Sequence, residues 1–395
     1  MLRLTFITSC DLGEASGPAV HAINIANAVA RLGASVTLVA ARPDGPLAVA
    51  LDPAVNANFV ANPRRLRLPG AVVFLLAVPA LYRSRQSVVH VRSAPGSSFV
   101  TWLARSFRPL RLTLELNGWL QDEAQFVRRA RPFRHLIGYM QRRELFMADR
   151  IRVVTSGLAR RVEQNGIPGE RIRAISTGVD LSVFKPLDRA ESRRALGLPV
   201  EGKRLVFVGN LWEAIDMDMV LAALDILRKS GRDVRLTIVG GGRRFGAIRA
   251  DCERFGEAVT MTGWLPQSEA IRHIAAADIA LAPFKNRHGD LTGLSPLKIR
   301  DYAAAGRRVV ASDLPGVRQR NNPAWLRLAN PGDARAFALA IAEGLDHGTP
   351  EEETEARAFA EAHFGWDWVA RKMLTDLWDV QPHLLERRRA ERPDA

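Results

Sequence analysis

The chain has 395 residues, 47% hydrophobic and 25% charged, which fits two folded domains with separate cores and excludes gross disorder. Its two cysteines, Cys10 and Cys252, lie far apart and without metal-ligand spacing, so a disulfide scaffold is excluded and a reducing compartment is expected. The net charge of +14 lies in residues 1–200, which hold 28 Lys and Arg against 14 Asp and Glu, while residues 201–395 hold 28 of each.

This one-sided charge indicates an acidic partner. An anionic membrane, a phosphorylated acceptor or a nucleic acid would each suit an arginine-rich surface. An Arg-rich genomic composition is the alternative, but it should affect both halves of the chain. We therefore expect a membrane or an acidic acceptor, and no nucleic acid because the basic half has no recognisable nucleic-acid-binding module.

The first half of the chain predicts the βαβ beginning of a parallel α/β domain. The start of the chain indicates a first strand and not a signal peptide. The loop over residues 9–17 has no G-x-G-x-x-G motif, so a dinucleotide site is poorly supported. Strands are predicted over residues 2–8, 35–40, 88–91, 112–116 and 151–155, and a helix over residues 18–32.

The longest apolar stretch, residues 68–81, has arginines on both sides. It is shorter than the roughly 20 residues that cross a bilayer. It fits either a buried core helix or a helix lying in a membrane interface, and the sequence leaves both readings open.

Polar side chains of the first half are candidates for a site. His90 and Arg92 share one face of a predicted strand by parity, as do Glu115 and Asn117 at the end of the next strand. A carboxylate in so apolar a strand is costly without a partner, which favours a functional role for Glu115. His90 could instead be solvated or packed against a helix. His21, in the first predicted helix, could reach the site or cover the surface.

The polar segment 187–203, which contains Pro199, predicts a linker. Strands and helices then alternate again, and glycines follow several strands at the edge where open α/β sheets bind ligands. Strands are predicted over residues 204–208, 234–239, 259–262, 279–283 and 309–312, and helices over residues 218–229, 245–255 and 268–276.

One further helix has a start that suits phosphate binding. Ser295 suits the N-cap, Pro296 the first helical position and Gly306 the stop. Lys298 lies in the first turn, where the helix dipole disfavours a cation, and a bound anion would explain it. Asp301 could accept hydrogen bonds from sugar hydroxyls. An ordinary crossover helix with a surface lysine is the alternative.

These features together resemble the retaining glycosyltransferases of family 4, which have two Rossmann-like doubly wound domains facing a cleft (the B-type glycosyltransferase fold). The resemblance covers nearly the whole chain and rests on short motifs that are each weak alone. The motifs are Gly17-Pro18, Ala148-Asp149-Arg150-Ile151, Val154-Thr155-Ser156, Thr177-Gly178-Val179-Asp180, Val208-Gly209-Asn210-Leu211, Ile238-Val239-Gly240-Gly241-Gly242, Gly263-Trp264-Leu265 and Phe364-Gly365-Trp366.

The resemblance implies an α/β fold with an acceptor-side domain over residues 1–186, a donor-binding domain over residues 187–365 and a helix over residues 366–395 that returns to the first domain. The donor would be a nucleotide-diphosphate sugar, a substrate and not a cofactor. The implied donor-side residues are Gly209, Asn210, Gly240, Arg243, Trp264, Leu265, Gly293, Leu294, Ser295, Lys298 and Asp301.

Roles within this set are also implied. Asp301 falls where the family holds the nucleotide ribose, and residues 293–295 fall where loop amides meet the phosphate and sugar. Trp264 and Leu265 fall near the base-binding loop.

In the first domain, Arg92 and the Glu115-Leu116-Asn117-Gly118 run resemble a branch of the family that has Glu-x-Asn in place of a His motif. Transfer with retention would need no metal, because the leaving diphosphate can take the acceptor proton while a lysine and N–H groups stabilise its charge. No Asp-x-Asp motif lies in a suitable loop, so no metal site is expected. The implied catalytic residues are Arg92, Glu115 and Lys298, and the implied acceptor-side residues are Gly17, His21, His90 and Asn117.

Three departures from the family pattern concern the donor site. Asn210 stands where a phosphate-binding Arg is usual, Ile215 where a Lys is usual, and Gly293 where the first acidic residue is usual. Cations that could compensate are Arg243, Arg244, Arg287 and Lys298.

The expected function is transfer of a sugar to a glycan or lipid-linked acceptor in cell-surface polysaccharide biosynthesis. The expected location is the cytoplasm, with peripheral attachment to the inner face of the plasma membrane. A non-catalytic relative that binds a glycan or a partner protein and a nucleotide-sugar epimerase are the alternatives.

Overall fold

The structure is a computed structural model, and it divides the chain into two compact units, each described here by itself. Unit 1 comprises Met1–Thr177 with Trp366–Ala395, and unit 2 comprises Gly178–Gly365. The residues that the structure describes are 2–14, 16–62, 72–83, 88–107, 111–124, 130–286, 297–319 and 323–381.

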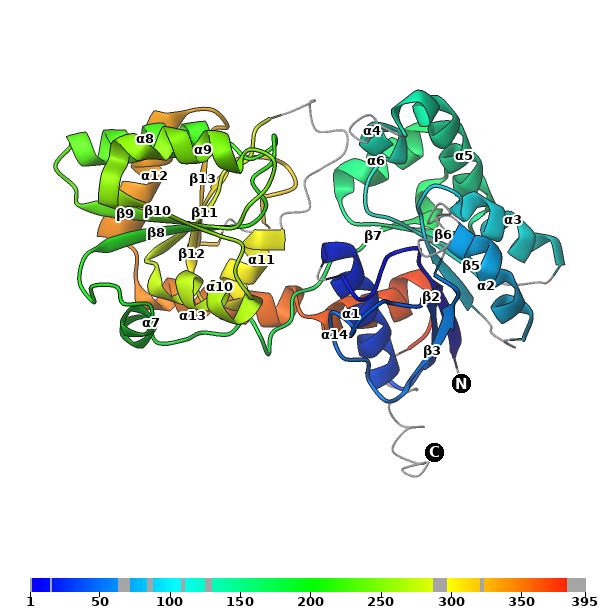
Figure 1. Cartoon of the computed structure of the whole chain (residues 1–395). Coiled ribbons are helices and arrows are strands. Elements are labelled where there is room, and N and C mark those ends of the chain that lie inside the picture. Colours follow the sequence, from blue (N-terminus) through cyan, green and yellow to red (C-terminus); the bar gives the residue numbers. More distant parts are fainter. Residues whose placement is uncertain are drawn as a thin grey trace. The chain divides into compact units, whose positions relative to one another are not determined.

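Unit 1 is built on a seven-stranded parallel sheet with the order β3-β2-β1-β4-β5-β6-β7 (Figure 1). Strands β1, β2, β4, β5 and β6 are buried except at one end residue each, as expected for a sheet that helices cover on both faces. Strands β3 and β7 were not predicted from the sequence. The strands are β1 Arg3–Ile7, β2 Ser35–Ala41, β3 Val55–Val60, β4 Val88–Arg92, β5 Arg111–Leu116, β6 Arg150–Val153 and β7 Ile172–Ala174.

Two apolar clusters identify the helices on each face of this sheet. One contains α1 and α14 side chains packed against β1 and β2, and the other contains Phe74, Val100 and Leu145 from α2, α3 and α5. The chain therefore returns from unit 2 to complete the core of unit 1. The helices of unit 1 are α1 Gly17–Arg31, α2 Val72–Arg83, α3 Ser97–Phe107, α4 Leu120–Ala124, α5 Arg134–Met147, α6 Ser156–Gln164 and α14 Trp366–Lys372, which continues as the π-helix Met373–Leu377.

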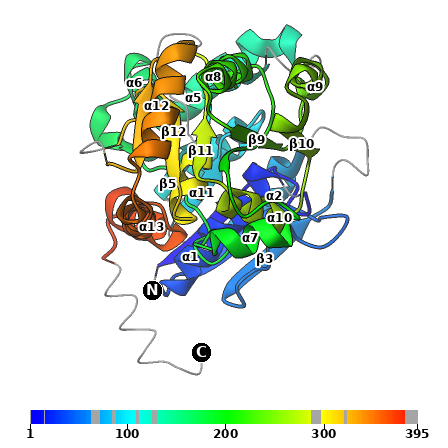
Figure 2. The ribbon, with the colours of Figure 1, turned by 90° about the vertical axis from the view of Figure 1, so that its left-hand side faces the viewer.

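Unit 2 has a six-stranded parallel sheet with the order β10-β9-β8-β11-β12-β13. Figures 1 and 2 show α8 and α12 on one face and α7, α10 and α13 on the other. Together, the two parallel α/β sheets confirm the predicted fold class. The elements are α7 Arg189–Ala195, β8 Lys203–Val208, α8 Met217–Lys229, β9 Val234–Val239, α9 Phe245–Cys252, β10 Val259–Gly263, α10 Gln267–Ala276, β11 Ile279–Ala282, α11 Leu297–Ala304, β12 Arg308–Ser312, β13 Leu326–Ala329, α12 Ala334–Asp346 and α13 Pro350–His363.

The linker prediction for residues 187–203 is wrong. This segment contains α7, which Asp188 caps by accepting from the Glu191 N–H. The Arg193 side chain is buried and donates to the Asp278 carboxylate over 2.9 Å. Residues 178–186, expected in the first domain, also pack in unit 2, where the Val179 N–H donates to the Phe364 carbonyl.

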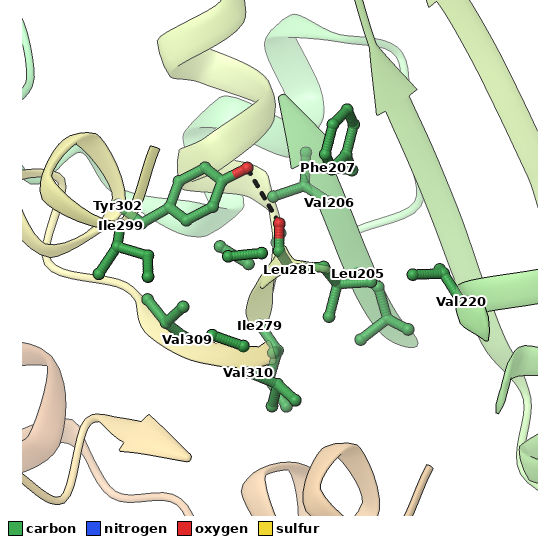
Figure 3. Close-up of a cluster of buried hydrophobic side chains, with 14 of the residues drawn as sticks. Leu205, Val206, Phe207, Val220, Ile279, Leu281, Ile299, Tyr302, Val309 and Val310 are labelled. Carbon is green, nitrogen blue, oxygen red and sulfur yellow. Dashed lines mark hydrogen bonds between the residues drawn. The ribbon is translucent and has the colours of Figure 1, made fainter. Parts of the chain in front are cut away.

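Tyr302 of α11 closes a gap in the unit 2 sheet. Strands β8 and β11 pair only near their starts, so their later peptide groups lack each other as partners. The Tyr302 hydroxyl accepts from the Val208 N–H over 2.8 Å. It also donates to the Leu281 carbonyl over 3.3 Å (Figure 3). This buried hydroxyl fixes α11 against the carboxyl edge of the sheet.

Replacing Tyr302 by Phe should lower the free energy of unfolding by about 1–3 kcal/mol, because the buried Val208 N–H loses its acceptor. Urea unfolding measures the change. Tyr139→Phe is the matched control, since the Tyr139 side chain is exposed and its change should be within about 0.5 kcal/mol. Equal effects of the two substitutions would contradict the bridging role.

Candidate functional site

The carboxyl edge of the unit 1 sheet holds a buried carboxylate with several partners. Glu115 Oε1 lies 2.9 Å from His21 Nε2 and accepts from Asn117 Nδ2 over 2.6 Å and from Arg92 Nη1 over 3.4 Å. Its Oε2 lies 3.2 Å from His90 Nε2. The structure thus brings the first-domain candidates His21, His90, Arg92, Glu115 and Asn117 together.

Arg152, a further partner of Glu115, was not predicted from the sequence. Arg152 is fully buried, donates to Glu115 Oε2 and also donates to the carbonyls of Ile175 and Ser176 over 3.1 and 2.9 Å. Register explains the cluster, because Glu115 is aligned with Arg92 on β4 and with Arg152 on β6. An arginine between apolar residues of a predicted strand was the available signal, because such a charge needs a partner when it is buried.

Aromatic rings from the C-terminal segment pack against the two histidines. The His90 ring lies edge-on to Phe6 and Trp378, with centroids 4.9 and 5.8 Å apart, and the His21 ring lies 5.4 Å from Trp366. His90 is therefore buried, and the solvated alternative for it is wrong. The packing fixes both ring planes relative to Glu115.

Charges in this cluster are set by burial and by one another. Burial alone would raise the pKa of Glu115, but His21 and Arg152 outweigh it and hold that pKa well below its usual value. Burial lowers the pKa of His21 to about 4 and also lowers that of His90. At neutral pH the cluster therefore holds a carboxylate, neutral imidazoles and guanidinium groups.

A small cavity adjoins this cluster and is lined in part by Phe6, Thr8, His21, His90 and Arg92. The buried Nδ1 of His21 has no hydrogen-bond partner among the described residues. Both Glu115 oxygens already have hydrogen-bond partners, so the Glu115 side chain is placed to orient its neighbours.

The carboxyl edge of the unit 2 sheet carries tight glycine turns after β8 and β9. A Cβ on Gly240 would lie 2.1 Å from the Gly209 carbonyl oxygen, and Gly240 has φ of 128°, so only glycine fits there. A Cβ on Gly241 would lie 2.6 Å from the Trp264 indole nitrogen. Trp264 itself is 66% exposed, whereas Leu265 packs against the unit 2 core.

Lys298 of α11 lies at this edge beside Gly209. Its ammonium lies 5.2 and 4.8 Å from the ring centroids of Phe207 and Phe284. Burial lowers the pKa of Lys298 to about 8 and raises that of Asp301 to about 7. A cation held on aromatic faces next to a glycine turn is suited to an anionic ligand.

The other cations near this edge already face carboxylates. Arg243 lies 3.4 Å from Glu213, Arg244 lies 3.0 Å from Asp218, and Lys285 lies 2.9 Å from Asp218. Ile215 is fully buried and the exposed Asn210 approaches Gly242, so neither replaces the missing cations.

Several predicted residues lie elsewhere. Gly17 is the first residue of α1, where a Cβ would meet no atom within 4 Å. Gly293, Leu294, Ser295 and Arg287 lie outside the described residues. The roles of all the site residues remain predictions.

No cluster of three His, Cys, Asp or Glu side chains in the described ranges is arranged to hold a metal ion. The sequence Asp216-Met217-Asp218 lies at the start of α8, where Asp216 caps the helix and Asp218 pairs with the cations named above. Within the part of the chain that the structure describes, no helix has the length and hydrophobicity needed to cross a membrane.

One curated relative aligns along nearly the whole of this chain, and another aligns along part of it. A D-inositol 3-phosphate glycosyltransferase of Thermobispora bispora is 28% identical over 95% of this chain and 91% of its own. The protein of that name from Acidothermus cellulolyticus is 31% identical over 62% of this chain and 55% of its own.

Solved structures agree on the fold. Sucrose-phosphate synthase of Thermosynechococcus elongatus has a TM-score of 0.73 at 18% identity, covering 96% of this chain and 98% of that one. HepE of Anabaena, solved with UDP and glucose, has a TM-score of 0.68 at 16% identity, covering 96% of this chain and all of that one.

Two family models match successive parts of the sequence. The model described as Glycosyltransferase Family 4 matches residues 15–183, and the model described as Glycosyl transferases group 1 matches residues 202–347. With the relatives and the two parallel-sheet units, these matches identify the chain as a glycosyltransferase of family 4 with the B-type fold.

Proposed function

We propose that this glycosyltransferase moves a sugar from a nucleotide-diphosphate sugar to an acceptor hydroxyl with retention of the anomeric configuration and without a metal. The observation that carries the proposal is Lys298, a cation on two aromatic faces beside the Gly209 turn. The known complex of HepE with UDP and glucose supports a donor of this class.

In the proposed reaction the bond between the sugar C1 and the diphosphate oxygen breaks, and the acceptor oxygen bonds to C1 on the same face. The acceptor proton passes to the leaving diphosphate. The Lys298 ammonium stabilises the negative charge that develops there. Asp301, Gly209, Gly240 and Trp264 would contact the nucleotide, and Gly293, Leu294 and Ser295 would meet its phosphate and sugar.

The unit 1 cluster would take the acceptor. Arg92 is its more exposed guanidinium, and His21 Nδ1 is a buried polar atom to which no described residue forms a hydrogen bond. Glu115 would hold Arg92, His21 and Asn117 in place. A glycan or lipid-linked acceptor in polysaccharide biosynthesis at the cytoplasmic face of the membrane is the proposed substrate. The names of the relatives add D-inositol 3-phosphate to the acceptors worth testing.

A non-catalytic binding role is the second candidate, because Asn210 and Ile215 leave the diphosphate without two usual cations. Turnover decides between the two roles. Incubation with sugar nucleotides of uridine, guanosine and adenosine should stabilise the protein thermally and yield a glycosylated acceptor. NMR of the product reports retention, and added EDTA tests metal independence. Stabilisation without turnover on a broad acceptor panel would favour the binding role.

The affinity for the best-bound nucleoside diphosphate should fall about tenfold per pH unit above pH 8. The free protein loses the Lys298 proton as the pH rises through its lowered pKa of about 8, and the neutral amine no longer attracts phosphate. Calorimetric titrations between about pH 8.5 and 10 lie well above the pKa of Asp301, which is about 7, so Asp301 stays ionised throughout.

Lys298→Arg should remove this pH dependence, since guanidinium stays protonated. Lys229→Gln is the control at an exposed lysine of unit 2, and it should leave the profile unchanged. An unaltered profile in Lys298→Arg would place the titrating group elsewhere.

Arg92→Gln should reduce turnover at least about tenfold while donor affinity stays the same, because Arg92 would act on the acceptor side. The unfolding free energy of the Arg92→Gln variant should change by no more than about 1 kcal/mol, because Arg92 Nη1 lies 3.4 Å from Glu115 Oε1 and is the most distant of the Glu115 partners described above. Steady-state kinetics and urea unfolding measure both effects. A rise in the donor KM alone would contradict this assignment.

Arg152→Met should instead cost about 3–5 kcal/mol of unfolding free energy, because it strands the buried Glu115 carboxylate. Arg31→Met is the matched control: its pair with Asp367 is exposed on both sides and should contribute at most about 1 kcal/mol. Similar losses in both variants would show that Arg152 does not hold the cluster.

A further inference from the structure

Helix α5 buries polar side chains and exposes large apolar ones, beside the buried Leu145 and several exposed arginines. Its buried side presents Gln141 and Glu144, which accept hydrogen bonds from the Leu120 N–H over 3.0 Å and the Ser93 hydroxyl over 3.1 Å. Its outer side presents Leu136, Tyr139 and Phe146, each more than half exposed. Polar anchors therefore fix the rotation of α5 and hold an apolar stripe in the open.

Neighbouring helices extend this stripe. Helix α3 exposes Phe99 and Trp102, whose ring centroids lie 6.1 Å apart, and α2 exposes Leu75. Figure 1 shows α5, α3 and α2 next to one another on one side of unit 1, and their inner residues share a single apolar cluster. A surface of this extent is unusual for a protein that has no partner there.

Arginines accompany the exposed rings. Arg131, Arg134, Arg142 and Arg143 are all exposed on α5 or just before it. By sequence, unit 1 holds 30 Lys and Arg against 17 Asp and Glu, a net charge of +13, while unit 2 holds 26 against 25. The exposed apolar side chains therefore lie on the strongly basic unit.

We propose that the outer surface of α2, α3 and α5, here called the α2–α3–α5 face, docks on an anionic lipid bilayer. Aromatic rings enter the headgroup region of a bilayer, and arginines pair with lipid phosphates beside them. Neither signal is strong alone, but together they hold a protein at an anionic surface. A second copy is a poor occupant, because two units of charge +13 repel each other. The inference stands apart from the sugar transfer proposed above.

The test is co-sedimentation of the full chain with phosphatidylcholine vesicles with and without phosphatidylglycerol. Binding is expected only to the anionic vesicles and should weaken as salt is added. The double variant Tyr139→Ser/Phe146→Ser and the double variant Arg142→Glu/Arg143→Glu should each lower the partition coefficient at least about tenfold, since each arginine near such a surface contributes about 1 kcal/mol.

Matched controls lie on α12 of unit 2, where Leu339→Ser and Arg335→Glu change one exposed apolar and one exposed basic residue. Both should bind vesicles like the unchanged chain. Thermal unfolding of every variant shows that the fold is retained. The proposal would be overturned if the controls lost vesicle binding as strongly as the double variants, or if the chain bound neutral vesicles alone. It would also be overturned if the chain bound no vesicles and instead formed a dimer that the Tyr139→Ser/Phe146→Ser variant dissociates. Nucleotide-sugar binding is measured in parallel, so failure of the membrane proposal and failure of the transfer proposal give different results.

Discussion

A carboxylate buried inside a parallel sheet has to be neutralised, and unit 1 is organised around that requirement. Glu115 is surrounded by side chains from α1, β4 and β6 and by Asn117 just after β5, and the strand register aligns Arg92 and Arg152 with it. Moving any of these strands by one residue would turn its partner to the opposite face. The ion cluster and the sheet register therefore depend on each other.

Unit 2 meets a different constraint at the corresponding edge of its sheet. There the backbone has to pass close to itself, as in the approach of Gly240 to the Gly209 carbonyl. The small glycine turns leave room near Lys298, whose ammonium lies on two aromatic faces and forms no ion pair with a carboxylate among the described residues. Unit 1 thus has a pre-paired polar centre, while unit 2 has a cation with capacity left for an anion. The proposed roles in acceptor positioning and phosphate binding would place these two different demands on the two sites.

Periodicity was enough to predict most strands and helices. Strand β9 was predicted with its observed bounds, and α1, α8 and α11 were predicted to within a residue or two, because their apolar faces and stop glycines are distinct. Strands β3, β7 and β13 were missed because they are short or carry half-exposed residues. Helix α7 was read as a linker because its buried arginine looks like a solvated charge in the sequence.

The same difficulty applied to the site. Parity paired His90 with Arg92, and Glu115 with Asn117, but it could not join different strands, so Arg152 went unnoticed. The sequence also could not show that Ile215 is buried, because its burial depends on contacts that form only in the tertiary fold.

Unit 2 is one continuous stretch of chain, whereas unit 1 is assembled from two stretches that flank it. Trp366 and Trp378, which lie against His21 and His90, are synthesised only after all of unit 2. The sequence of the inserted unit is therefore complete before the histidine centre has its aromatic neighbours. A truncated product would thus keep one intact lobe and lack the aromatic packing around these histidines.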